Sequence, residues 1–190
     1  GSASVIRAII QKKQEHEKHK LWYQGPMFRY ERPQKGRFRQ FHQVGVEYLG
    51  YEEGIAEYEL ISMVLQINKL IGISDYTIKI NHLGDQDAKE SFCNSLTAFL
   101  KPHINELHEK DQARLKSNPL RVLDSKEKST QELLKEGPKF QDFISNDSKI
   151  FLKNLVDAFS NHCDIQIDQS LVRGLDYYTG IVFETVSAKL

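Results

Sequence analysis

The sequence contains few cysteines, and none has the spacing of a metal site. Cys93 and Cys163 are its two cysteines, they lie far apart in the chain, and there is no CxxC pair. Neither a disulfide framework nor a cysteine zinc site is therefore indicated. Unpaired thiols are usual in a reducing compartment, so we expect a cytoplasmic protein.

The chain also lacks a long hydrophobic run. Its longest apolar stretch, Leu60–Ile73, is interrupted by Gln66, Asn68 and Lys69, whereas a membrane helix needs about 20 predominantly apolar residues. The first residues, Gly1-Ser2-Ala3, include neither a methionine nor a signal-type apolar run, and Gly-Ser is common as a cloning scar. We expect no membrane span, and we expect the chain to be a piece of a longer protein.

Neither sign of charge is in excess. Lys plus Arg and Asp plus Glu each number 26, and the mean hydropathy is −0.52. This balance excludes a globally basic nucleic-acid binder and a globally acidic solvating chain, so any electrostatic function must be local. With 39% hydrophobic and 10% aromatic residues, the 190 residues can fill the core of one large domain, with or without an inserted module.

Three glycine-dependent motifs are absent as well. The sequence has no GxGxxG, no GxxxxGK[ST] and no GxSxG, so it predicts neither a glycine-rich phosphate loop nor a nucleophile elbow. His16 and His19 lie three positions apart near Glu15, but an exposed helix end accounts for them better than a metal site does. We expect no metal site made by protein side chains alone, and any Mg²⁺ would accompany bound phosphates.

The first part of the chain has the periodicity of a mixed α and β structure. Helical spacing covers residues 3–19 and 52–71, and β-prone segments cover residues 21–30, 37–49 and 76–80. Turn residues at 32–36 make the first two strands an antiparallel hairpin. Pro26 inside the first of them indicates an edge strand or a bulge.

The pattern changes at about residue 85. From there to residue 163 the chain is mostly helical, rich in lysine, and broken by three prolines. Ser129–Glu132 has the pattern of a capping box at a helix start. Alternation returns at Asp164–Asp168 and again at Tyr177–Val186. We interpret the middle segment as a helical module inserted into a sheet, which gives an α+β fold.

One face of the predicted hairpin concentrates chemical groups. Alternate residues of a strand share a face, so one side of the second strand carries Arg37, Arg39, Phe41, Gln43, Gly45 and Glu47. The same rule groups Met27, Arg29 and Glu31 on the first strand. The opposite face carries Phe38, Val44, Val46 and Tyr48, which we expect to be the packing side.

This face divides into a phosphate half and an amine half. Arginine binds two phosphate oxygens at once and stays charged near neutrality. Gln43 and Glu47 offer acceptors for an ammonium group or an imidazole N–H, and Phe41 could stack on a base. A solvated ribbon would also be rich in charge, but the shared parity of cations and acceptors favours a binding site.

A second cluster lies near the end of the sequence. Residues 171–180, Leu-Val-Arg-Gly-Leu-Asp-Tyr-Tyr-Thr-Gly, place an arginine and an aspartate in a turn that runs into a strand with two tyrosines. The pattern alone leaves two interpretations open. It is either part of a site or a glycine-containing loop with buried aromatic packing.

The two clusters resemble motifs of the histidyl-tRNA synthetases, a family of class II aminoacyl-tRNA synthetases. Leu21–Gln43 looks like the family's motif 2 hairpin, and Leu171–Glu184 looks like its histidine-specific signature. Asn118–Lys126 is similar to a stretch of the family's insertion domain. The likeness therefore covers nearly the whole chain, and the bacterial type of the family fits best.

The resemblance implies an antiparallel class II sheet flanked by helices, with an inserted helical module. Residues 3–84 would be the catalytic core with the motif 2 hairpin, residues 85–163 the inserted domain, and residues 164–190 the core continued. The implied reaction activates histidine with ATP, accompanied by Mg²⁺, to histidyl-adenylate and then transfers histidine to tRNA(His). The full-length parent would be a homodimer.

On the ATP side, the resemblance assigns one role to each matching residue. Arg29 would hold the α-phosphate, Glu31 the adenine amino group, and Arg37 the outer phosphates, while Phe41 would stack on adenine. Arg173 occupies the place of the family's catalytic arginine, which contacts the α-phosphate.

On the histidine side, the resemblance is equally specific. Gln43 would bind the α-amino group, Glu47 and Tyr178 would read the imidazole, and Tyr177 would lie beside it. Ser2 falls about where the family has a threonine in the loop that grips the amino acid.

Other parts of the family pattern fall outside this sequence: motif 1, motif 3 and the anticodon-binding domain. We therefore expect the chain alone to be poorly active. An alternative is a regulatory paralogue such as the histidine-sensing subunit of ATP phosphoribosyltransferase, which would share the fold without aminoacylation. A third interpretation is a helical RNA-contacting module on an inert sheet. The presence of both the ATP and the histidine residues favours the synthetase.

Overall fold

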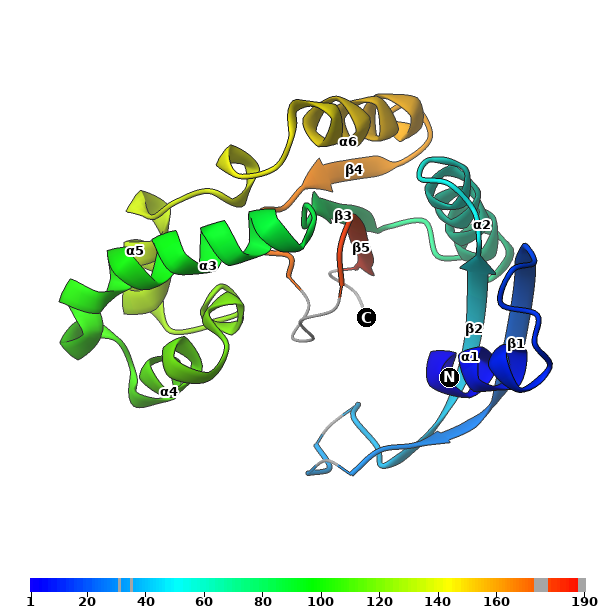
Figure 1. Cartoon of the computed structure of the whole chain (residues 1–190), viewed down its shortest axis with the longest axis horizontal. Helices are drawn as coiled ribbons and strands as arrows, with labels where there is room; N and C mark the ends of the chain where they lie inside the picture. The colour runs from blue at the N-terminus through cyan, green and yellow to red at the C-terminus, as the bar shows by residue number, and fades with distance from the viewer. Residues whose placement is uncertain (31, 35, 173–177, 188–190) are drawn as a thin grey trace. The chain divides into compact units, whose positions relative to one another are not determined.

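The structure is a computed structural model that describes residues 1–30, 32–34, 36–172 and 178–187. The chain divides into two compact units, Gly1–Leu60 and Ile61–Leu190. The α+β class predicted from the sequence is confirmed, because helices and both antiparallel and parallel strand pairs occur (Figure 1). Among the described helices, none is long and apolar enough to cross a membrane.

The first unit is built on a long antiparallel hairpin. Its elements are α1 (Ser2–Gln11), β1 (His19–Phe28), β2 (Gln40–Leu49) and the first turn of α2 (Ile55–Leu70). The register runs from His19 opposite Leu49 to Phe28 opposite Gln40 without a break. Pro26 lies opposite His42 in this ladder. Proline has no backbone N–H, and β1 tolerates it because it is an edge strand, paired with β2 alone in the described sheet.

Two predicted boundaries in this unit are wrong. The first helix ends at Gln11 instead of residue 19, since the segment that follows is polar and offers no apolar face to bury. The second strand begins at Gln40 instead of residue 37, because Gln34 and Arg37 pair with each other across a tight turn.

The second unit contains a three-stranded sheet in the order β4-β3-β5. Its strands are β3 (Thr77–His82), β4 (Asp164–Ile167) and β5 (Ile181–Val186). β3 pairs with β5 antiparallel and with β4 parallel. A parallel pair needs a long crossover, and the helical segment between β3 and β4 supplies it.

The crossover contains four α-helices and three short 3₁₀ helices, and the structure describes all of its residues. They are α3 (Gln86–Leu100), η1 (Lys101–Glu106), α4 (Glu109–Ser117), η2 (Pro119–Val122), α5 (Lys128–Glu136), η3 (Phe140–Asp142) and α6 (Asn146–Phe159). α6 packs along β3 and β4 (Figure 1). The predicted domain boundaries at residues 84/85 and 163/164 stay a prediction.

The core of the second unit is aromatic and aliphatic. Phe92 of α3 meets Phe140 with ring centroids 4.5 Å apart and Phe143 at 5.6 Å. Leu96, Leu100 and the neighbouring apolar side chains of η2 complete the cluster. Full burial of each such side chain contributes about 1.5–3 kcal/mol to folding.

A buried carboxylate ties the crossover helices together. Asp111 of α4 accepts hydrogen bonds from Ser125 at 2.5 Å, from Thr130 at 2.9 Å and from the Arg114 guanidinium at 2.9 Å. The predicted capping box at Ser129 is therefore wrong. α5 already begins at Lys128, and Thr130 in its first turn bonds to Asp111.

Candidate functional site

The hairpin register decides which side chains share a face. Residues directly opposite each other in an antiparallel pair point to the same side. Tyr23 lies opposite Gly45, Leu21 opposite Glu47, and Met27 opposite Phe41. The register therefore places Phe41, Gln43 and Glu47 on one face, together with the odd-numbered residues of β1. We call this the odd face.

The predicted packing side is wrong for half of its members. Val44 is 65% exposed and Phe38 is 64% exposed. The reason lies in α1, whose first residues contact the odd face through Ser2 and Glu47. Along β1 the odd-numbered residues are accordingly the less exposed ones. The odd face thus carries the polar groups and is also the partly covered side.

Glu47 is held by the start of α1. The Ser2 hydroxyl donates a hydrogen bond of 2.5 Å to Glu47 Oε1. The other carboxylate oxygen, Oε2, remains an acceptor in the same plane. Ser2 was singled out from the sequence only through the resemblance, and the structure places it at a residue expected to read histidine.

Tyr23 is a member of the odd face that the sequence analysis missed. Its hydroxyl accepts a hydrogen bond of 3.3 Å from Gln43 Nε2. The ring lies across Gly45, where an added Cβ would overlap it. Gly45 therefore leaves room for the Tyr23 ring between Gln43 and Glu47. The strand register, which pairs Tyr23 with Gly45, is the signal that could have identified this residue.

Arg29 and Phe41 come together at the other end of the face. The Arg29 guanidinium carbon lies 4.4 Å from the centre of the Phe41 ring, a cation–π distance. Arg29 Nε donates to the Phe38 carbonyl oxygen at 2.8 Å, and its backbone N–H donates to Arg39 at 2.9 Å. The arginine that we expect to hold a phosphate is thus anchored beside the ring that we expect to stack on a base.

Arg37 lies in the turn rather than on the strand. Its backbone N–H donates to Gln34 at 2.8 Å and its carbonyl accepts from Gln34 at 3.2 Å. Gly36, with a φ of +75°, allows the chain to close this turn. Strand parity therefore does not fix the direction of the Arg37 side chain, which corrects the premise used to place it on the face.

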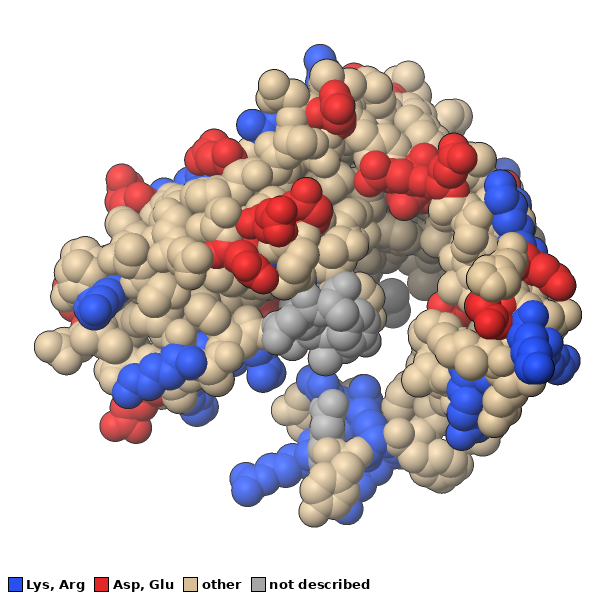
Figure 2. Space-filling model, viewed as in Figure 1, with Lys and Arg blue, Asp and Glu red and all other residues tan. Residues whose placement is uncertain are grey.

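Lys and Arg side chains gather over the end of the hairpin (Figure 2). The described members are Arg29, Arg32, Arg37 and Arg39. The Arg39 guanidinium carbon lies 5.7 Å from the centre of the Tyr30 ring. A concentration of cations on an exposed turn attracts a polyanion even in a chain with no net charge.

Three predicted site residues lie outside the described residues: Glu31, Tyr177 and Arg173. Tyr178 is described and belongs to the second unit. Its side chain is 40% exposed, and its backbone carbonyl accepts a hydrogen bond of 2.9 Å from Lys89 Nζ. The structure thus fixes the main chain of one of the two predicted tyrosines.

Two ion pairs lie away from the predicted site residues, and each lowers the pKa of its carboxylate. Hydrogen bonds from Lys20 and then from Tyr48 lower the pKa of Glu59 on the exposed side of the first unit. In the second unit, burial acts to raise the pKa of Asp168, but hydrogen bonds from Lys79 and Ser170 outweigh it, so that pKa is lowered. Both carboxylates are therefore ionised and paired at neutral pH.

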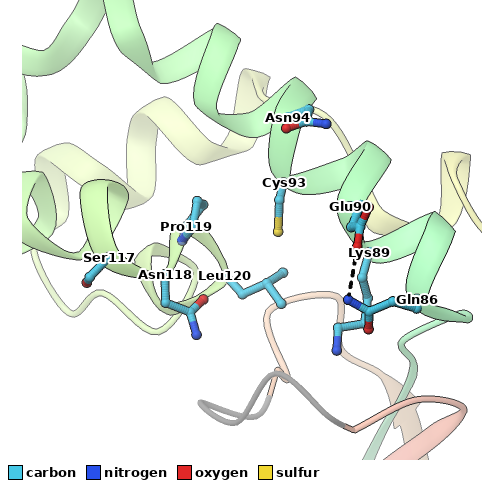
Figure 3. A pocket seen from close by; sticks show the side chains of 9 residues that line it. All are labelled: Gln86, Lys89, Glu90, Cys93, Asn94, Ser117, Asn118, Pro119 and Leu120. Carbon is cyan, nitrogen blue, oxygen red and sulfur yellow. Dashed lines mark hydrogen bonds between the residues drawn. The ribbon is translucent and has the colours of Figure 1, made fainter.

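A pocket of about 390 Å³ lies between α3 and the α4–η2 turn (Figure 3). No predicted site residue among those that the structure describes lines it. Its walls are formed by Gln86, Lys89, Glu90, Cys93, Asn94, Ser117, Asn118, Pro119 and Leu120. In the described part of the chain there is no group of three His, Cys, Asp or Glu side chains that could hold a metal ion.

Comparison with known proteins gives a consistent result at the level of sequence. The family model described as histidyl-tRNA synthetase matches residues 1–190. The histidine–tRNA ligase of Latilactobacillus sakei subsp. sakei is 40% identical over 99% of this chain and 44% of its own length. The enzyme of Francisella tularensis subsp. novicida is 43% identical over 100% of this chain and 46% of its own length.

Solved structures agree with this. The crystal structure of apo histidyl-tRNA synthetase from S. aureus matches 97% of this chain and 44% of its own with a TM-score of 0.71 at 32% identity. An ATP phosphoribosyltransferase regulatory subunit/histidyl-tRNA synthetase from Bacillus halodurans matches with a TM-score of 0.62 at 20% identity, which shows the fold alone. The chain spans less than half the length of the curated relatives described above.

Proposed function

Because the chain belongs to the histidyl-tRNA synthetase family over its whole length, we propose that it forms the central part of the catalytic domain of a histidine–tRNA ligase. The intact protein would activate histidine with ATP and transfer it to tRNA(His), acting as a homodimer in the cytoplasm. Residues 85–163 would be the inserted helical domain. Relatives named histidine–tRNA ligase support this proposal.

One observation supports the proposal most directly. A single face of the hairpin carries the Arg29–Phe41 pair at one end and Gln43, Tyr23 and Glu47 at the other. A cation beside an aromatic ring suits a nucleotide, since the ring can stack on a base and the guanidinium can bind a phosphate. A carboxylate next to amide and phenol groups suits an amino acid with a basic side chain.

The proposed chemistry is attack of the histidine carboxylate on the α-phosphorus of ATP. The α-phosphate oxygens gain negative charge as the carboxylate adds, and pyrophosphate then leaves. Arg29, anchored by its bond to the Phe38 carbonyl, would stabilise that charge without reorganising, which lowers the barrier more than it strengthens ground-state binding. Arg37, Arg173 and Glu31 would complete the ATP site, and Mg²⁺ would accompany the phosphates.

Selectivity for histidine would depend on Glu47 together with Tyr177 and Tyr178. Glu47 is positioned by Ser2, so that its remaining oxygen can accept an imidazole N–H. An apolar amino acid of similar shape would leave this carboxylate without a partner, and such mismatches at polar sites give large discrimination. Gln43 would bind the α-amino group through its carbonyl oxygen, since its amide nitrogen already donates to Tyr23.

The test is histidine-dependent ATP–pyrophosphate exchange by the intact protein that carries this chain. We expect Glu47→Gln to raise the KM for histidine about 100-fold while the KM for ATP changes less than about twofold. Arg29→Ala should lower kcat by about 100-fold or more with little change in histidine affinity. Glu52→Gln and Arg7→Ala, which alter exposed charges of the same unit, are the matched controls.

Two outcomes would contradict the proposal. If Glu47→Gln weakened ATP and spared histidine, the division of the face would be wrong. If the intact protein bound histidine but catalysed no exchange, the result would favour the regulatory-subunit alternative, whose structural relative shares the fold.

A further inference from the structure

Two buried polar side chains of the second unit have no part in the proposed chemistry. Asn81 at the end of β3 is 0% exposed, and Lys89 in the first turns of α3 is 3% exposed. Burial of an amide or an ammonium group is costly unless the group is hydrogen-bonded. Their partners therefore show what these side chains hold in place.

Both side chains donate to backbone carbonyls within the histidine-specific signature, at Leu171 and at Tyr178. Asn81 Nδ2 donates to the Leu171 carbonyl at 3.2 Å, while its Oδ1 accepts from the His82 backbone N–H at 2.9 Å. Lys89 Nζ donates to the Tyr178 carbonyl at 2.9 Å. The two contacts hold Leu171 to β3 and Tyr178 to α3.

The residues after Tyr178 are fixed by the same part of the fold. The Gly180 N–H donates to the Gly84 carbonyl at 2.9 Å, and the Leu83 N–H donates to the Gly180 carbonyl at 2.7 Å. Gly84 has a φ of +60°, and a Cβ there would lie 2.7 Å from Ala88 Cβ. This turn leads directly into α3, whose Asp85 cap accepts from the Ala88 N–H at 2.8 Å.

Lys89 reaches the carbonyl from a helix that starts one turn earlier. Figure 3 shows its side chain extending from α3 at the edge of the pocket. A methionine would fill nearly the same volume without the desolvation cost of an ammonium group. The ammonium group therefore contributes something that packing does not, which includes a strong donor to the Tyr178 carbonyl oxygen.

We propose that Lys89 is a positioning residue for histidine recognition: it fixes the Tyr178 main chain and thereby the direction of the Tyr178 phenol. Asn81 acts in the same way at Leu171. This inference rests on the proposed function, because it gives Lys89 a role only if Tyr178 contacts the imidazole. Lys89 does not touch substrate, so its loss acts through the placement of the tyrosine.

The experiment replaces the ammonium group in the intact protein and separates the kinetic constants of pyrophosphate exchange. Lys89→Met should raise the KM for histidine roughly tenfold and leave the KM for ATP within about twofold. Lys89→Arg keeps a cationic donor and should restore most of the histidine affinity. In a Tyr178→Phe background, Lys89→Met should have a much smaller effect on histidine, because the group that it positions has been removed.

The matched control is Lys139→Met. Lys139 Nζ donates to the carbonyls of Leu134 and Lys135 at 3.2 Å and 2.6 Å, so the same chemistry is removed elsewhere in the unit. We expect the control to leave both KM values unchanged. Equal effects of Lys89→Met and Lys139→Met on the KM for histidine would overturn the inference while leaving the proposed function intact.

A wild-type protein without histidine-dependent exchange would refute the proposed function instead. If Lys89→Met is unfolded at the assay temperature, Lys89→Gln tests the same point, since its amide stays polar but is too short to reach the carbonyl. An unchanged KM for histidine in folded Lys89→Gln would overturn the inference, and the selective rise would support it.

Discussion

In the unit Gly1–Leu60, Ile9 is the buried apolar side chain among the described residues, and the hairpin exposes Trp22, Phe28 and Val44. In the unit Ile61–Leu190, a continuous cluster around Phe92, Leu96 and Phe140 is almost completely buried. The first unit therefore depends on ladder hydrogen bonds and a few specific contacts, whereas the second depends on packing. The comparison shows that the face with the most candidate site residues belongs to the unit with the smaller core.

The largest test of this contrast replaces an aromatic residue in each unit. Phe92→Ala should lower the free energy of unfolding by about 3–5 kcal/mol, because it leaves a cavity beside Phe140 and Phe143. Trp22→Ala should change it by less than about 1 kcal/mol, since that side chain is 69% exposed. Urea unfolding monitored by circular dichroism measures the change in the free energy of unfolding for both variants.

Equal losses in the two variants would break the comparison. They would mean that Trp22 is buried in the protein in solution and that the first unit has a larger core than its described residues indicate. Hydrogen exchange offers a second readout, because amides of α3 should be protected far more strongly than amides of β1.

A smaller effect should come from the specific contact on the odd face. Gly45→Ala places a methyl group in the space of the Tyr23 ring, and we expect a loss of about 1–3 kcal/mol from the displaced ring. In the intact protein the KM for histidine should rise as well, since Tyr23 bonds Gln43 beside Glu47.

The control for this prediction is the same substitution in a Tyr23→Ala background. There the methyl group has room, so most of the penalty should disappear. A penalty that persisted would show that Gly45 is required for the backbone of β2 rather than for the tyrosine.

In both units the sequence predicted the type of the elements better than the contacts between them. The α+β class, the hairpin and the return of the sheet after the helices follow from local periodicity, which a single sequence carries. The shared face of Phe41, Gln43 and Glu47 follows from the period of a strand. These predictions needed no knowledge of which strand pairs with which.

Most of the failures depend on pairing or on distant contacts. Arg37 left the strand because Gln34 closes a turn with it, and Tyr23 was missed because its place depends on the register with Gly45. The alternation of residues along β2 showed that Val44 and Val46 share a face. It did not show that α1 contacts the other face, the odd face. Thr130 bonds Asp111, and such a contact between distant residues leaves no periodic signal.

The smallest predicted effect on stability comes from the ion pairs, of which each unit offers one for comparison. Lys79 Nζ lies 2.8 Å from Asp168 Oδ2, and the Asp168 side chain is 22% exposed, whereas that of Glu59 is 43% exposed. Lys20 and Glu59 lie 2.6 Å apart on the exposed surface of the first unit. Exposed pairs are screened and contribute little, so we expect the pair of the second unit to have the greater effect on stability.

The sign of the pH dependence follows from the Asp168 carboxylate. Its pKa is lower in the folded chain than the ordinary 3.8, because the bonds from Lys79 and Ser170 outweigh the effect of burial. The unfolded chain therefore binds the proton more readily. This contribution to stability is fully present above 3.8 and is lost as the pH falls through the lowered pKa.

Asp168→Asn should therefore reduce the free energy of unfolding by about 0.5–1 kcal/mol at about pH 6. The reduction should be smaller at about pH 2.5, because this pH lies below the ordinary carboxyl pKa of 3.8 and the unfolded chain then binds the proton. Urea titrations at a series of pH values give the difference between the two curves. The pKa of Glu59 is also lowered, but Glu59→Gln should leave the curve unchanged within error because Lys20 and Glu59 are exposed. A larger acid-dependent loss for Glu59→Gln than for Asp168→Asn would show that partial burial does not decide which ion pair stabilises this chain.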